Sequence, residues 1–167
     1  MIFNVFFRLW RIVSTILLTA NLMFSYIRLP ESIAFVFDQT GQPSAFTGKQ
    51  TFFYWTAGII FLVNIFTLFL KNSLESVDFK KAYPQSLWAN SSIHLKTQIS
   101  TWFNAFLAII NTYLIFVILG LGNINAKKDQ SLDFDYNKLL MFGALVLLGM
   151  LFYLPLRILF SNPPAEK

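Results

Sequence analysis

The chain alternates between uncharged apolar runs and short stretches that hold nearly all of its charges. Spanning about 30 Å of hydrocarbon takes roughly 20 helical residues. Four apolar stretches are long enough, the first and last only when the arginines near their ends are included, and they predict helices over about 5–27, 51–70, 100–122 and 139–159. The pattern therefore predicts an all-α integral membrane protein, a single domain of four transmembrane helices.

The first run could instead be a cleaved signal peptide, because Leu18-Thr19-Ala20 is a weak cleavage site. The apolar stretch continues to Ile27, which is longer than a typical signal-peptide core. Arg8 and Arg11 near its start can extend their charged ends to the membrane surface. We therefore expect the first run to be retained as a transmembrane helix.

The composition supports a membrane protein and argues against binding of nucleic acid. Of the 167 residues, 56% are hydrophobic and 13% are charged, whereas about a quarter of an average soluble domain is charged. The net charge is +5, but the longest basic runs are pairs such as Lys80-Lys81, and no basic stripe is present. The chain has no cysteine, which excludes disulfides, thiolate metal sites and a cysteine nucleophile. No cofactor is expected.

The distribution of lysine and arginine predicts that both termini face the cytoplasm. The connections are then an outer loop at 29–50, an inner loop at 71–99 and an outer loop at 123–138. The inner side holds eight basic residues: Arg8, Arg11, Lys71, Lys80, Lys81, Lys96, Arg157 and Lys167. The outer side holds five: Arg28, Lys49, Lys127, Lys128 and Lys138.

The first outer loop combines turn residues with an apolar segment. Pro30 can start a short helical or extended segment, and the residues from Ile33 to Phe37 are too apolar to remain in water. The stretch Asp38-Gln39-Thr40-Gly41 indicates a turn in which glycine supplies a positive φ. Pro43 and Gly48 are expected to keep the rest of the loop irregular.

The same loop resembles the signature of a bacterial membrane family, the domain of unknown function 1648, which also begins the Sdp-type toxin-immunity proteins. The matching positions are Leu29, Pro30, Phe37, Gly41, Pro43 and Lys49. Asp38 replaces the usual asparagine, and Val36 replaces the usual histidine, so the chain looks like a degenerate member. The resemblance implies a bacterial cytoplasmic (inner) membrane location. It also makes Pro30, Phe37, Asp38, Gly41, Pro43 and Lys49 candidate residues for recognition outside the cell.

Three of the predicted helices carry small and hydrogen-bonding residues along one face. The faces are Ser14, Leu18, Asn21 and Ser25 in the first; Ala57, Phe61, Asn64 and Thr67 in the second; Thr101, Asn104, Ala108 and Asn111 in the third. Such seams are typical of helix–helix packing in membranes. Packing is the preferred interpretation, and a polar pocket or partner site at the bilayer midplane is the alternative. The fourth helix has Gly143 and Gly149 but no polar centre, which suits a face toward lipid or a partner.

Catalytic chemistry finds little support in the residues. His94 is the only histidine and lies in a predicted inner loop near a helix start. Asp129, Asp133 and Asp135 lie in the second outer loop without the turn glycine and oxygen ligands that calcium favours. We therefore expect a small non-enzymatic membrane subunit or interaction protein, in contact with the bilayer and with other membrane protein subunits. The alternatives are a toxin-immunity or peptide-sensing protein and a small-solute or lipid transport component.

The orientation is testable with topology reporters. Alkaline phosphatase is active only after export, so a fusion after Lys128 should be active and a fusion after Lys167 inactive. A fluorescent protein that folds only in the cytoplasm should give the opposite pattern. An active phosphatase fusion at Lys167 would contradict the proposed orientation.

Overall fold

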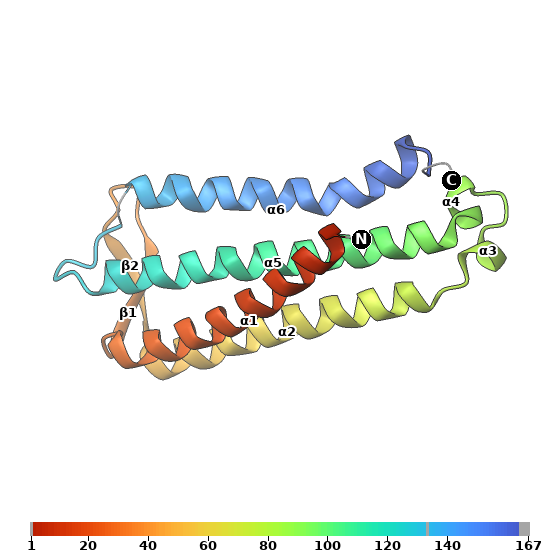
Figure 1. Cartoon of the computed structure of the whole chain (residues 1–167). Coiled ribbons are helices and arrows are strands. Elements are labelled where there is room, and N and C mark those ends of the chain that lie inside the picture. The colour runs from red at the N-terminus through yellow and green to blue at the C-terminus, as the bar shows by residue number, and fades with distance from the viewer. Residues whose placement is uncertain (1, 133, 164–167) are drawn as a thin grey trace.

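A computed structural model describes residues 2–132 and 134–163 of the chain. Four long helices lie side by side, with a two-stranded sheet at one end and two short helices at the other (Figure 1). We call these the hairpin end and the loop end. The elements are α1 (Ile2–Arg28), β1 (Ser32–Phe37), β2 (Pro43–Gly48), α2 (Lys49–Ser76), α3 (Phe79–Ala82), α4 (Leu87–Asn90), α5 (Ser92–Asn125) and α6 (Phe134–Phe160).

The expected all-α membrane architecture is confirmed. Each of α1, α2, α5 and α6 is long and apolar enough to cross a membrane. All four extend beyond the predicted spans, since a helix that is already formed continues into polar sequence where local contacts support it. In α2, for example, Lys71 Nζ lies 3.1 Å from Glu75 Oε1, one turn further on. The expected inner loop 71–99 is therefore partly helical at both ends.

Helix α5 is the centre of the bundle. In its most apolar stretch 33% of the residues are buried within the protein, against 11% in α1 and 6% in α2 and α6. Leu107 and Asn111 on α5 are fully buried, as is Leu18 on α1. The other helices therefore pack mainly on α5 and turn their remaining apolar side chains outward.

Helix α6 is attached to α5 by two reciprocal tyrosine–glycine contacts. A Cβ added to Gly120 of α5 would come within 1.6 Å of the Tyr136 ring of α6, and one added to Gly143 of α6 within 2.3 Å of the Tyr113 ring of α5. The Tyr113 hydroxyl donates to the Leu140 carbonyl at 3.1 Å, and the Tyr136 hydroxyl donates to the Phe116 carbonyl at 2.6 Å. Gly143, expected on a lipid or partner face, therefore lies in an internal contact.

The first loop forms an antiparallel hairpin of β1 and β2, with Ser32 opposite Gly48 and Ala34 opposite Phe46. Gly41 has φ +81°, which confirms the expected glycine turn. The expectation that Pro43 and Gly48 would keep the loop irregular was wrong. Both residues are at the ends of β2, where the missing proline N–H and the missing glycine side chain cost the ladder little.

The hairpin is fastened to the end of α5 along the outer edge of β1. The Asn125 side chain accepts from the Ala34 N–H at 2.7 Å and donates to the Ala34 carbonyl at 3.0 Å. It thus binds both backbone groups of Ala34, as a third strand would. The segment after α5 adds a bond from Gln130 Nε2 to the Ser32 carbonyl and one from the Leu132 N–H to the Gly41 carbonyl.

Replacing Asn125 by leucine should loosen the hairpin. Two buried backbone groups of Ala34 would lose their partner, at a cost of roughly 1–3 kcal/mol. Hydrogen–deuterium exchange in detergent should show faster exchange of the Ala34 amide, while the amides of α5 around Asn111 stay protected. Asn123→Leu, at an exposed position on the same helix, serves as the control. Unchanged exchange at Ala34 in the Asn125 variant would show that the bond does not hold the hairpin.

Candidate functional site

Two places in the structure hold the residues that the sequence singled out: a cluster of amides inside the bundle and the hairpin at its end. The amide cluster joins α1, α2 and α5. Asn111 Nδ2 donates to Asn64 Oδ1 at 3.0 Å, and Asn64 Nδ2 donates to Asn111 Oδ1 at 3.0 Å. Asn111 Nδ2 also donates to the Thr15 hydroxyl at 3.0 Å. The side chain of Asn111 is fully buried, so its polar atoms find partners inside the protein.

The asparagines above and below this level also make cross-helix bonds. Asn21 Nδ2 donates to the Ile115 carbonyl at 3.2 Å. Asn104 Nδ2 donates to Asn4 Oδ1 at 3.2 Å, while Asn104 Oδ1 is buried without a partner among the described residues. The four asparagines Asn21, Asn64, Asn104 and Asn111 thus all lie at helix contacts, although they do not form one connected site.

One member of the predicted seams lies elsewhere. Phe61 of α2 is 64% exposed and belongs to the outer surface of the bundle. Asn64 and Thr67 remain on the packed side, the first half-buried and the second buried. The 3–4 spacing placed Phe61 near the right face, but a large aromatic side chain does not fit the close approach that small residues allow.

The amide cluster itself contains no group that titrates or binds a metal strongly. Within the part of the chain that the structure describes, no three histidine, cysteine, aspartate or glutamate side chains gather as metal ligands. His94 and Asp129 are both exposed, and Asp133 lies outside the described residues. The cluster can therefore hold helices together or bind a neutral polar group, and its one hydroxyl, that of Thr15, accepts a hydrogen bond from Asn111.

The six candidate residues of the loop lie in the hairpin or directly beside it. Three of them, Asp38, Gly41 and Lys49, form hydrogen bonds or an ion pair within the protein. Asp38 Oδ1 accepts from the Thr40 hydroxyl at 2.7 Å, from the Thr40 N–H at 2.8 Å and from the Gln42 N–H at 2.9 Å. The Thr40 hydroxyl bond first, and then the Gln42 backbone bond, hold the pKa of this carboxyl below its usual value. The carboxylate thus closes the turn in its charged form.

The remaining candidates lie around that turn and at the start of α2. A Cβ on Gly41 would come within 2.9 Å of the Leu132 carbonyl oxygen, so the close approach of the next loop requires glycine. Lys49 Nζ lies 3.6 Å from Glu31 Oε1 and 5.2 Å from the centre of the Tyr26 ring. Pro30, Phe37 and Pro43 are half-buried. These contacts give the loop its shape, whether or not the residues also bind a partner.

The exposed apolar side chains of the hairpin are three others: Phe35, Val36 and Phe46, which are 48%, 43% and 51% exposed. Ile33 and Ala34, by contrast, are fully buried against the bundle. The sequence predicted that the segment from Ile33 to Phe37 would lie at the membrane interface or pack on the protein. The structure packs Ile33 and Ala34 but leaves Phe35 and Val36 exposed. The sequence gave no signal for Phe46, because β2 was expected to be irregular. We refer to Phe35, Val36 and Phe46 as the exposed hairpin residues.

The fold defines a multi-pass membrane protein with a structured hairpin at one end of its helices. Searches of family models, curated proteins and solved structures find no match to the chain. The function is therefore inferred from the geometry of the described residues.

The amide pair can be tested by a double-mutant cycle. Asn64→Leu and Asn111→Leu should each lower the free energy of unfolding in detergent by about 0.6–2 kcal/mol. The double variant should cost less than the sum of the single variants, because each single change leaves the other amide without its partner. Asn123→Leu, at an exposed position, should have little effect. Additive losses would mean that the two amides do not depend on each other.

Proposed function

We propose that the protein is a small, non-enzymatic integral membrane subunit that contacts another membrane protein through its hairpin. The observation that supports this most is the combination of a hairpin fastened to α5 by Asn125 with three exposed apolar side chains. A partner that buries these side chains would gain their hydrophobic surface at a small entropic cost, since the hairpin is already ordered.

The hairpin lies outside the hydrocarbon in this proposal. It follows the Arg28 end of α1 and precedes α2, and its strands contain backbone groups that lipid could not satisfy. On the proposed orientation, with both termini cytoplasmic, the hairpin faces the exterior. The resemblance of the loop to the domain of unknown function 1648 supports a bacterial cytoplasmic membrane as the location.

A second candidate function, toxin immunity or peptide sensing, is favoured by the free edge of β2. Ala34 directs its backbone groups to Asn125, so Phe46 opposite it should direct its own N–H and carbonyl to the other edge of the sheet. Among the described residues, no further strand pairs with β2 on that side. An extended peptide could add there as a third strand.

A solute transport role receives less support from the bundle interior. The amides of Asn64 and Asn111 bond to each other and to Thr15. A polar solute at this level would have to break those bonds before it could form its own. The exposed hairpin residues and the β2 edge are therefore the better basis for a functional assignment.

We expect binding of the partner to depend on the exposed hairpin residues. A tagged protein isolated from native membranes in mild detergent should recover a membrane protein in stoichiometric amount. The double variant Phe35→Ser, Phe46→Ser should lose that protein, while its thermal unfolding stays close to that of the unmodified chain because both side chains are exposed. The matched control is Phe61→Ser, Phe66→Ser, which removes two exposed phenylalanines of α2 and should retain the partner.

Two outcomes would decide between the candidates or reject both. If a peptide binds and the Phe46 amide then becomes protected from hydrogen–deuterium exchange, strand addition and peptide sensing are favoured. Equal recovery of the partner by the hairpin variant and the unmodified chain would reject the hairpin as the contact, as would the recovery of no stoichiometric protein.

A further inference from the structure

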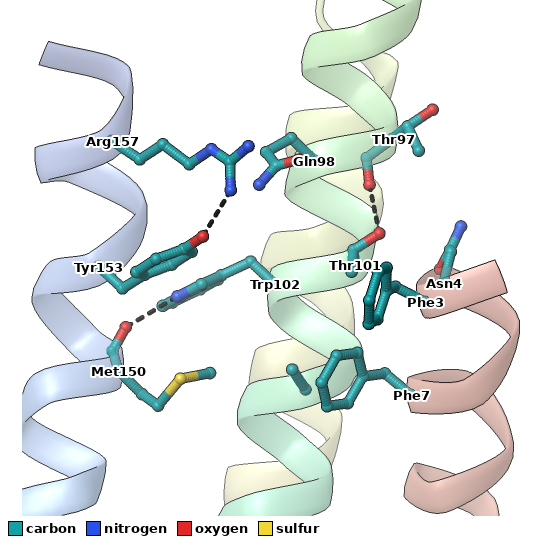
Figure 2. A pocket seen from close by; sticks show the side chains of 11 residues that line it. Phe3, Asn4, Phe7, Thr97, Gln98, Thr101, Trp102, Met150, Tyr153 and Arg157 are labelled. Atoms are coloured by element: carbon teal, nitrogen blue, oxygen red, sulfur yellow. Dashed lines mark hydrogen bonds between the residues drawn. The ribbon is translucent and has the colours of Figure 1, made fainter. Parts of the chain in front are cut away.

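A groove lies between α1 and α6 on the side of α5 near the loop end. Its volume is about 510 Å³, which falls within the roughly 300–1,000 Å³ of small-molecule sites. Figure 2 shows α5 as the floor and α1 and α6 as the walls. These two outer helices each pack on α5 and hardly touch one another. The groove is thus open sideways, toward the space that lipid occupies around the bundle.

The lining of the groove changes from polar to apolar along its length. Figure 2 shows Arg157 and Gln98 toward the loop end, and Phe7 and Met150 further into the bundle. Trp102 lies between these levels, and its indole Nε1 donates to the Met150 carbonyl at 2.8 Å. The polarity therefore runs in the same sense as that of an amphiphile whose polar end lies toward the membrane surface.

Arg157 is held at the polar end of the groove by its neighbours. Its Nη1 donates to the Tyr153 hydroxyl, and its guanidinium lies 5.8 Å from the centre of the Tyr153 ring. When the Gln98 amide oxygen faces it, Arg157 also donates from Nε at 3.2 Å and from Nη1 at 3.0 Å. No described carboxylate lies within ion-pair distance of Arg157. A guanidinium carries five N–H donors, and those on Nη2 make no bond to a described residue.

We propose that this groove binds one anionic phospholipid, with its phosphate at Arg157 and an acyl chain along Phe7, Trp102 and Met150. A planar guanidinium favours phosphate because it can donate two parallel hydrogen bonds. The apolar side chains of the groove would pack against the acyl chain, which a free phosphate lacks. On the proposed orientation this end faces the cytoplasm, where the leaflet surface carries anionic lipid. The site is remote from the hairpin and does not depend on the proposed function.

Native mass spectrometry of the detergent-purified chain tests this site. Phosphatidylglycerol and phosphatidylcholine with identical acyl chains are titrated separately. The unmodified chain should bind one phosphatidylglycerol at least about fivefold more tightly than phosphatidylcholine, the preference that one basic residue near the membrane surface supports. Arg157→Gln should abolish that preference. Arg28→Gln should retain it, because Arg28 lies at the hairpin end, over the Phe24 ring.

A second variant tests the acyl part of the groove. Thr101 lies on the α5 floor, so Thr101→Phe should fill the space and weaken binding of both lipids, with folding checked by thermal unfolding. A phosphatidylglycerol preference that survives Arg157→Gln would overturn the proposal. The proposal would also be overturned if inorganic phosphate displaced phosphatidylglycerol and Thr101→Phe left lipid binding unchanged, because the groove would then be a simple anion site. Crosslinking of a protein segment, in place of lipid, to a photoreactive side chain introduced at Phe7 would overturn it too.

Discussion

A polar group inside a membrane protein must find its partner within the protein, because hydrocarbon offers none. In this chain α5 supplies most of those partners. Three of its asparagines act at different depths: Asn104 meets Asn4 of α1, Asn111 meets Asn64 of α2 and Thr15 of α1, and Asn125 meets the backbone of β1. These amides link α1, α2 and the hairpin to α5, beside the apolar packing of Leu18 and Ile118.

Helix α6 obeys the same constraint in a different way. Aromatic side chains make most of its links to α5: Tyr113, Trp102 and Tyr136 each donate to a backbone carbonyl across the contact. Gly120 and Gly143 make room for two of these rings. Because α6 packs mainly on α5 and hardly touches α1, a groove remains between α6 and α1, and Arg157 lies at its polar end. The separate attachment of α6 thus creates the space that we assign to a lipid.

The sequence was sufficient to predict the four long helices, because charges excluded from hydrocarbon mark the ends of each span, but it did not predict the short helices α3 and α4. It also placed Asn64 and Asn111 on the polar faces of two helices, and the structure brings them into contact. Strand β2 was missed because Pro43 and Gly48 suggest irregular backbone, and only their positions at the strand ends remove the conflict. Asn125 was missed for a different reason. Its partner is the backbone of Ala34, 91 residues earlier, and no periodicity along the chain reveals such a bond. The groove could not be predicted from the sequence either, because its lining residues come from three different helices.

We propose that α5 holds the hairpin as a rigid platform for a partner. The chain has no native cysteine, so nitroxide labels can be attached at Val36→Cys and Lys128→Cys without first replacing other cysteines. Pulsed electron spin resonance in lipid nanodiscs then gives the distance distribution between the hairpin and the loop after α5. We expect one narrow distribution of distances, which broadens when Asn125 is replaced by leucine. A broad distribution with Asn125 in place would contradict it.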